Sequence, residues 1–421
     1  MKRFILTLVL VLGALACASA QEAMNPELEA LLQENIFRTG VNTNPYEFLP
    51  QAETPVPAGY KPFYISHYGR HGARSDWEGE DYARAEQMYT KAHELGLLTD
   101  EGERAFKEVS EIVALHNHMD GRLTPRGARE HRGIAHRMYN KYKKVFKGKN
   151  RTVRAVSSTA PRCIVSMAAF TSELLSLNPK LDMGWDTGNA FMTYCSSVDP
   201  DDVHDEAYKL IYAHADAHAP DVDRFLARIF KDPSKCSELV GKPEDILNGT
   251  FAIAAICGSF DHDDFLLKLF TEEERYYYSQ NVSMNLYLRQ CNSKEFGERR
   301  MAVAEVQGFV DDVIAKADDA IEKGTVAADL RFGHDYQLLA VCSRIGIKGI
   351  AERMDAQECL DWPGFLYSPF AGNLQMVFYR NKKNDVLVKF YINERETTLI
   401  TLPGGPYYKW DDVKEAFKTC P

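Results

Sequence analysis

Short β-type runs and helical repeats alternate along the first half of the chain. Strands are predicted over Phe63–Ser66 and Thr152–Val156, where β-branched and aromatic residues gather. Apolar residues recur at helical spacing over Asp81–Leu95 and Pro125–Phe146, and another helix is predicted to begin at Pro161. Because strand, helix and strand follow one another, we expect an α/β fold with a parallel-type sheet core flanked by helices.

The pattern changes between residues 186 and 324, where polar loops and helical repeats prevail and strand signals are scarce. The clearest element there is Ala302–Lys323, whose apolar positions form one stripe and which Gly324 terminates. We interpret residues 186–324 as an inserted α-helical cap domain. The α/β core is then discontinuous and consists of residues 21–185 and 325–421.

Strand patterns return after this insertion. A strand is predicted over Val326–Phe332, and Leu374–Tyr379 and Val386–Tyr391 flank a polar stretch, as in a β-hairpin. Near the other end of the chain, residues 21–60 hold scattered prolines and little periodicity. That composition predicts an extended arm that leads into the fold.

The first twenty residues differ from the rest of the chain. Lys2 and Arg3 precede the apolar run Phe4–Ala16, and Ala18-Ser19-Ala20 supplies small residues suited to a cleavage site. This order is typical of a secretory signal peptide, and the apolar run is too short to span a membrane. We therefore expect an exported protein, periplasmic or secreted, without a transmembrane segment. A lipid anchor at Cys17 is a less favoured variant, since the better cleavage site lies after it.

Nine cysteines occur in the full sequence, and cleavage after Ala20 removes Cys17. An even number in an exported chain favours disulfide bonds, and no pair has the C-x-x-C spacing of a zinc or redox motif. Buried free thiols are the alternative for some of them. The eight that remain are Cys163, Cys195, Cys236, Cys257, Cys291, Cys342, Cys359 and Cys420.

The formal net charge is −10, so the surface repels polyanions and we expect no nucleic-acid partner. Cations are instead concentrated after predicted strands. Arg70-His71-Gly72-Ala73-Arg74 and Arg162 follow the first two strands, and His334-Asp335 follows Val326–Phe332. Since ligands of open α/β sheets bind at the carboxyl ends of strands, we expect these segments to meet in one site.

These residue types suit a phosphate ester. Arg70, Arg74 and Arg162 can hold phosphoryl oxygens with planar pairs of donors, and the helix that begins beside Arg162 adds backbone N–H groups. A neutral His71 can attack phosphorus and form a covalent intermediate, while Asp335 can protonate the departing alkoxide. The sequence therefore favours a phosphomonoester hydrolase with His71 as nucleophile and Asp335 as acid.

Two other interpretations of the histidines are weaker. His67 and His71 stand four residues apart, as in a helical metal site, but the glycines beside them disfavour a helix. The dipeptide His-Asp also occurs at His204-Asp205 and His262-Asp263, in polar stretches that predict exposed surface. Of the three His-Asp pairs, His334-Asp335 alone follows a predicted strand and a glycine.

At these motifs the chain resembles the histidine acid phosphatases, a family of the histidine phosphatase superfamily that includes phytases. Arg70-His71-Gly72-Ala73-Arg74 matches the family's R-H-G-x-R motif, and His334-Asp335 matches its H-D pair. Gly121–Gly127 is similar to its G-x-L-T-x-x-G segment, and Arg162 lies where its third phosphate-binding arginine is expected. The resemblance covers residues from about Tyr60 to Pro421.

The resemblance implies a phosphoglycerate mutase-like α/β core with a variable α-helical domain and no metal or other cofactor. It also implies a phosphohistidine at His71 and Asp335 as the acid. The phosphate clamp that it implies consists of Arg70, Arg74, Arg162 and His334.

The expected partner is a small-molecule phosphate ester, either an inositol polyphosphate or a sugar phosphate. Pro57–Pro62 and Pro369–Leu374 resemble the phytase and multiple inositol polyphosphate phosphatase-like branch, which often has H-A-E where this chain has His334-Asp335-Tyr336. Two other functions stay open: a phosphotransferase or mutase of the same superfamily, and a catalytically inactive phosphate-ester binding protein. Intact His71 and Asp335 argue against the binding protein, and the signal peptide argues against a mutase.

Overall fold

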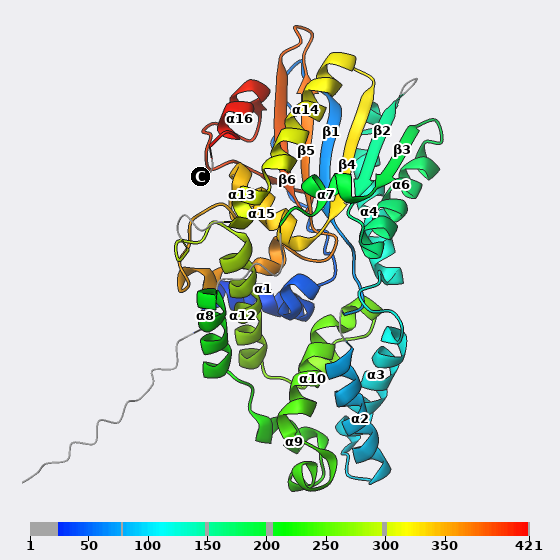
Figure 1. Ribbon diagram of the computed structural model, residues 1–421, viewed down its shortest axis with the longest axis vertical. Coiled ribbons are helices and arrows are strands. Elements are labelled where there is room, and N and C mark those ends of the chain that lie inside the picture. Colours follow the sequence, from blue (N-terminus) through cyan, green and yellow to red (C-terminus); the bar gives the residue numbers. More distant parts are fainter. Residues whose placement is uncertain (1–23, 77–78, 148–150, 199–204, 297–300, 420–421) are drawn as a thin grey trace, which may run out of the picture.

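The computed structural model describes residues 24–76, 79–147, 151–198, 205–296 and 301–419. One eight-stranded sheet occupies the upper part of Figure 1, in the order β3-β2-β4-β1-β5-β6-β7 with β8 paired to β6. The pairs β1–β4, β2–β4 and β2–β3 are parallel, whereas β1–β5 and the pairs beyond it are antiparallel. The fold class is α/β with a mostly parallel centre, as predicted. The strands are β1 (Lys61–Arg70), β2 (Thr152–Ser157), β3 (Asp182–Thr187), β4 (Val326–Gly333), β5 (Asn373–Arg380), β6 (Val386–Ile392), β7 (Arg395–Thr397) and β8 (Tyr408–Lys409).

Helices cover both faces of this sheet (Figure 1). One face packs against α4 (Pro125–Lys141), α5 (Lys143–Phe146) and α6 (Pro161–Leu177). The other packs against α14 (Gln307–Lys323), α15 (Asp335–Ile345) and α16 (Trp410–Ala416). The predicted hairpin and the helices that begin at Pro125 and Pro161 are confirmed.

The central strand β1 is buried on both faces because helices cover both sides of the sheet. Side chains alternate along a strand, so Tyr64 and Tyr68 pack toward α14 and α15, while Ile65 packs toward α4 and α6. This sandwiching fixes β1 rigidly, and β1 ends at Arg70, where the R-H-G-x-R motif begins.

The lower part of the molecule is helical (Figure 1). Helices α2 and α3 come from residues that we expected in the α/β core, but they pack in this lower part against α9 and α10. Conversely, α14 comes from the expected insertion and packs on the sheet. The short helix α7 (Met192–Cys195) contacts β2 and β4 of the sheet. The helices away from the sheet are α2 (Glu80–Glu94), α3 (Asp100–His116), α8 (Asp205–Ala217), α9 (Val222–Ile229), α10 (Pro243–Ile256), α11 (Phe265–Lys268), α12 (Glu272–Gln290) and α13 (Met301–Glu305). Short turns of helix are η2 (Asn189–Phe191), η3 (Cys236–Val240), η4 (Cys257–Phe260), η5 (Glu358–Asp361) and η6 (Gly364–Leu366).

The predicted extended arm is wrong for residues 26–43. They form α1 (Pro26–Glu34) and the 3-10 segment η1 (Ile36–Thr43). The side chain of Asn25 caps α1 by accepting a hydrogen bond from the Glu27 backbone N–H, and Leu28 and Leu32 bury one face of the helix. The capping residue Asn25 and the four-residue spacing of Leu28 and Leu32 are readable in the sequence, but the scattered prolines of residues 21–60 favoured an extended arm instead.

The seven described cysteines of the expected disulfide framework are free and buried. Five of the seven lie in apolar clusters and pack as small hydrophobic side chains, and no disulfide bond joins the seven to one another; the five are Cys236, Cys257, Cys291, Cys342 and Cys359. Cys420 and the predicted signal peptide fall outside the described residues. Among the helices that the structure describes, none has the length and apolar character needed to cross a bilayer.

Candidate active site

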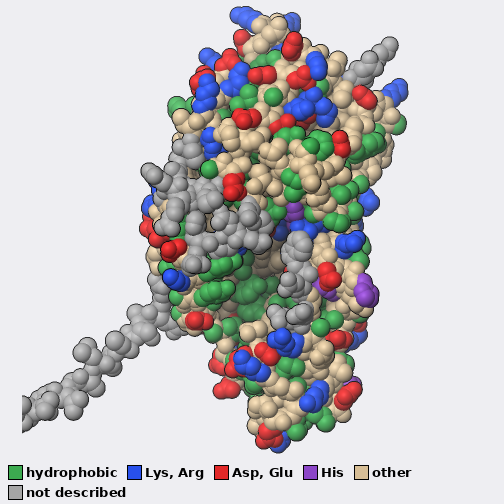
Figure 2. Space-filling model, in the orientation of Figure 1, with side chains coloured by type: hydrophobic (Ala, Val, Ile, Leu, Met, Phe, Trp, Pro, Cys, Tyr) green, Lys and Arg blue, Asp and Glu red, His purple; other side chains and the backbone are tan. Residues whose placement is uncertain are grey.

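Three neighbouring strands bring the predicted residues together. In the sheet order β2-β4-β1, His71 follows β1, Arg162 lies in the first turn of the helix after β2, and Asp335 follows β4. All six predicted residues line one cavity of about 770 Å³. Figure 2 shows a hollow in the middle of this face, with histidine and basic side chains visible at its upper margin.

The turn after β1 keeps its shape through two glycines. A Cβ atom on Gly72 would lie 2.5 Å from the Gly127 carbonyl oxygen, and one on Gly127 would overlap the Ala73 carbonyl oxygen. Thr124 caps α4 by accepting from the Gly127 N–H, and its hydroxyl donates to the Ala73 carbonyl at 3.1 Å. The G-x-L-T-x-x-G segment therefore packs directly against the R-H-G-x-R turn and holds it in place.

The His71 ring is buried and oriented by one hydrogen bond. Its Nδ1 lies 3.0 Å from the Gly72 carbonyl oxygen, which can only accept, so Nδ1 carries the proton and Nε2 keeps its lone pair. Burial, together with Arg70 and Arg162, holds the pKa of His71 well below its usual value. The imidazole is consequently neutral in mild acid, as a nucleophile requires.

Arg70 is almost fully buried beneath the cavity. Its Nη1 donates to the carbonyl oxygens of Asn42 at 2.6 Å and Ser368 at 2.9 Å, and its Nη2 lies 3.0 Å from Asp335 Oδ2. The guanidinium also lies over the Phe370 ring, 4.7 Å from its centroid. Burial lowers the pKa of Arg70 to about 10, which leaves the side chain cationic in neutral and acidic solution.

Arg162 and His334 form a contact pair. Arg162 Nη2 lies 3.2 Å from His334 Nδ1; since guanidinium only donates, Nδ1 accepts and Nε2–H donates to Ser158 Oγ at 3.0 Å. The ring stacks on Tyr336, with centroids 4.8 Å apart. Burial and the Arg162 charge lower the pKa of His334 to about 3, so this histidine is neutral.

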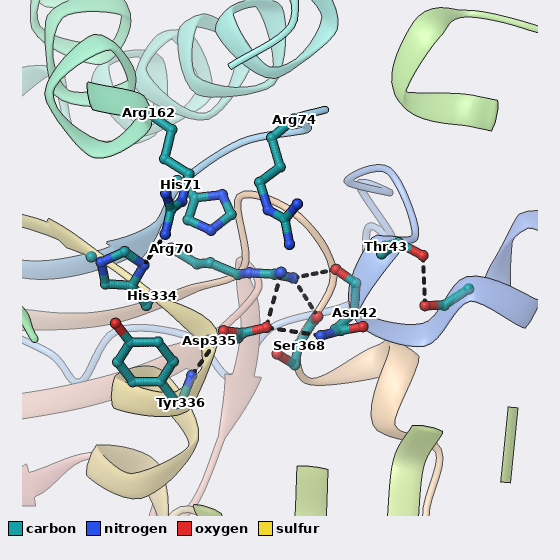
Figure 3. Close-up of polar contacts among 12 residues, drawn as sticks. Asn42, Thr43, Arg70, His71, Arg74, Arg162, His334, Asp335, Tyr336 and Ser368 are labelled. Atoms are coloured by element: carbon teal, nitrogen blue, oxygen red, sulfur yellow. Dashed lines mark hydrogen bonds and ion pairs between the residues drawn. The ribbon is translucent and has the colours of Figure 1, made fainter. Parts of the chain in front are cut away.

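Arg74 approaches the cavity from the turn after His71 (Figure 3). Its Nη1 donates to the Ser75 carbonyl at 2.8 Å and lies 3.3 Å from Asp76 Oδ1. The arginines 70, 74 and 162 thus converge on the His71 ring from different backbone segments (Figure 3). Such a group of donors is suited to a phosphoryl group.

Asp335 is the first residue of α15. Its Oδ2 accepts from Asn42 Nδ2 at 3.0 Å and pairs with Arg70, and its Oδ1 accepts from the Tyr336 N–H at 3.0 Å (Figure 3). Burial disfavours the carboxylate, but Arg70 and the Asn42 hydrogen bond outweigh it and hold the pKa of Asp335 at about 2. The carboxyl group is therefore ionised before a substrate binds.

Sequence reasoning missed several residues of the cavity. Asn42 belongs to the segment predicted as an arm, so no pattern linked it to the motifs. Asn285, Arg289 and Gln290 of α12 line the same cavity, together with Ser196 beside α7. They come from segments without a recognised motif, and only the folded chain shows their position.

His67 and the other described His-Asp pair lie away from the clamp. His67 lies outside the cavity, between Phe170 and Phe332, and faces a second buried histidine, His131. Among the described residues, no group of three or more histidine, cysteine or acidic side chains could hold a metal ion. Asp263 pairs with Arg104 on the surface, as expected for an exposed His-Asp pair. His204 lies outside the described residues.

The fold and this site define an α/β protein that gathers arginines around a neutral histidine at the carboxyl ends of parallel strands. Residues 69–393 match the histidine phosphatase superfamily (branch 2), and the chain belongs to that family. The predicted family and the class of enzyme, a phosphoric monoester hydrolase, are confirmed.

Solved structures of similar fold have low sequence identity. The Bifidobacterium longum multiple inositol polyphosphate phosphatase in complex with inositol hexasulfate is 16% identical, with a TM-score of 0.69 over 90% of this chain and 97% of that chain. The phytase from D. castellii is 16% identical, with a TM-score of 0.64 over 94% of this chain and 88% of that one. No curated protein sequence matches the chain.

Proposed function

We propose that this protein hydrolyses phosphomonoesters in two steps through a phosphohistidine at His71. The observation that carries the proposal is the neutral His71 ring, whose Nε2 lone pair is available among three arginines, with Asp335 in the same cavity. A binding protein would need the arginines but neither the oriented imidazole nor the carboxyl group.

In the first step Arg70, Arg74 and Arg162 hold the phosphoryl oxygens and neutralise their charge. His71 Nε2 attacks phosphorus and forms a P–N bond while the P–O bond to the ester oxygen breaks. Asp335 transfers its proton to that oxygen, so the alcohol leaves neutral. The enzyme now carries phosphohistidine and an ionised Asp335.

In the second step a water molecule attacks phosphorus and the P–N bond breaks, which restores the imidazole lone pair. Asp335 accepts the proton of the water and regains its acidic form. The balance of the two steps is ester plus water to alcohol plus inorganic phosphate. The bound substrate supplies the negative charge that raises the pKa of Asp335 from its low value before binding.

We further propose that the substrate carries several phosphates, as an inositol polyphosphate does. The B. longum neighbour is described with inositol hexasulfate bound, and the cavity here has polar groups beyond the clamp. Arg289, Asn285 and Gln290 on α12 line the cavity and are suited to phosphates that are not being cleaved. Export through the N-terminal segment is likewise part of the proposal.

Phosphate release from phytate, sugar phosphates and a nitrophenyl ester tests this function. We expect the wild type to release phosphate from all three substrates, with the highest kcat on phytate. The His71→Ala variant should release none. Transfer of the phosphoryl group to an added sugar without release of phosphate would instead identify a phosphotransferase. Tight phosphate binding without any turnover would identify a binding protein.

A further inference from the structure

The N-terminal segment places one uncharged side chain directly on the proposed acid. Asn42 lies near the end of η1, and its Nδ2 donates to Asp335 Oδ2 at 3.0 Å while its carbonyl oxygen accepts from Arg70 at 2.6 Å (Figure 3). Asn42 therefore bridges the clamp and the acid. Among the described residues, the other groups that contact the Asp335 carboxyl group are the charged Arg70 side chain and the Tyr336 backbone N–H. Asn42 is the uncharged side chain that donates to it.

The turn that carries Asn42 is held firmly. Thr43 Oγ1 lies 2.9 Å from the Gly40 carbonyl oxygen and 2.8 Å from the Ala255 carbonyl oxygen of α10. Val41 has a φ of 48°, a left-handed conformation that β-branched residues rarely adopt. Such strain persists where the surrounding structure enforces it, and here the outcome is an amide directed at Asp335.

The remaining groups around Asp335 are cationic or neutral in mild acid. Arg70 and Arg74 face it from β1 and the following turn, and Arg162 and Cys163 face it from α6. His334 and Tyr336 adjoin it in sequence. In the bound state the phosphoryl group competes for the arginines, whereas the Asn42 amide has no need to leave the carboxylate. Because an amide N–H can only donate, it favours the ionised form throughout.

We propose that Asn42 is a positioning residue that keeps Asp335 ionised and thereby sets the pH above which leaving-group protonation fails. The inference rests on the proposed role of Asp335 as proton donor. It goes beyond that role because it assigns control of the working pH to a residue outside the R-H-G-x-R and H-D motifs.

The test compares pH profiles of kcat on a sugar phosphate. A hydrogen bond to a charged group is strong enough to move the alkaline limb by about one pH unit. We therefore expect Asn42→Leu, which has a similar size and no donor, to shift this limb upward by about one unit. Asn42→Asp, which places a second carboxylate beside Asp335, should shift it further. Thr43→Val is the matched control, since it loosens the same turn and leaves the Asn42 amide in place.

A second measurement keeps this inference separate from the proposed function. Proton uptake on binding of inorganic phosphate is followed by calorimetry in buffers of different ionisation enthalpy, and its midpoint should move upward with the same Asn42 variants. If the wild type binds phosphate but hydrolyses no ester, the proposed function fails. The proton-uptake data would still show whether Asn42 lowers the pKa of Asp335. Unmoved limbs and midpoints in both Asn42 variants, or an equal shift in Thr43→Val, would overturn the inference.

Discussion

At the scale of single residues, the proposed mechanism depends on a conflict at Asp335. Arg70 and Asn42 outweigh burial and hold the pKa of this carboxyl group at about 2, yet a proton donor must be protonated when the ester bond breaks. The charge of the bound phosphate offsets the arginines and raises the pKa. The proposal therefore expects activity to be greatest in mild acid and to fall as Asp335 ionises in the complex.

The Asp335→Asn variant tests this role through the leaving group. Since general acid catalysis contributes about 10²–10⁴-fold, we expect a loss of that order in kcat/KM, which reports the first step, on a sugar phosphate, whose alkoxide needs a proton. The loss on nitrophenyl phosphate should be much smaller, because its leaving group departs as an anion. Equal losses on both esters would show that Asp335 is not the leaving-group acid.

Arg162 provides a second prediction at this scale. Its guanidinium contacts His334 Nδ1 and lines the cavity, two tasks that need a planar set of donors. Arg162→Lys keeps the charge but loses this geometry, so we expect kcat/KM to fall by about 10²-fold, as on loss of one transition-state donor. Full activity of the lysine variant would mean that Arg162 has no specific role in the clamp.

At the scale of elements, the contact between the turn after β1 and the start of α4 keeps the nucleophile in place. Gly127→Ala would bring a methyl group into the Ala73 carbonyl oxygen, and overpacking of this kind costs about 1–3 kcal/mol. We expect the variant to lose about this much stability and also kcat, because the turn carries His71. Gly133→Ala on the same helix is the control, and it should stabilise by about 0.5–1 kcal/mol since only the flexible end of Arg137 lies nearby. Equal effects of the two changes would contradict this account of the turn.

Two buried histidines, His67 in β1 and His131 in α4, are kept neutral by the fold. Burial lowers the pKa of His67 and of His131 to about 3, against about 6.5 in an unfolded chain. Between these values the unfolded chain binds protons that the folded chain does not, so stability falls as the pH falls from about 6.5 toward 3.

A non-titrating side chain at one of these positions should weaken this pH dependence. We expect His131→Leu to reduce the slope of unfolding free energy against pH, measured in urea between pH 4 and 6, by up to about 1.4 kcal/mol per pH unit. The exposed His136→Leu on the same helix is the control and should leave most of the slope intact. A slope that His131→Leu leaves unchanged would show that His131 is not held neutral.

At the scale of the whole molecule, the sequence predicted the parts of the fold that carry regular patterns. Buried strands such as β1 and β4, and the helices α4 and α6, were readable because their apolar periodicity agrees with a Pro at the first helical position. The edge strand β3 escaped prediction because its exposed residues carry no apolar alternation. The six motif residues converge because parallel strands end at one edge, which topology rules anticipate.

The rest of the site could not be predicted, because it depends on which distant segments the fold brings together. Asn42 reaches Asp335 from 293 positions away along the chain, and residues of α12 line the same cavity. The cysteine count suggested disulfides, yet the seven described thiols are free, and five of them lie in hydrophobic clusters. Counts and spacings hold no information on such long-range contacts.

The measurement that tests the central claim most directly is trapping of the covalent intermediate. Enzyme mixed with a substrate labelled in its phosphoryl group is quenched under conditions that preserve phosphohistidine, digested, and mapped by mass spectrometry. The proposed mechanism predicts label on the peptide that contains His71, a loss of label in His71→Ala, and more label in Asp335→Asn with nitrophenyl phosphate, since the second step then lacks its base. Label on a serine or aspartate, or normal turnover by His71→Ala, would contradict it.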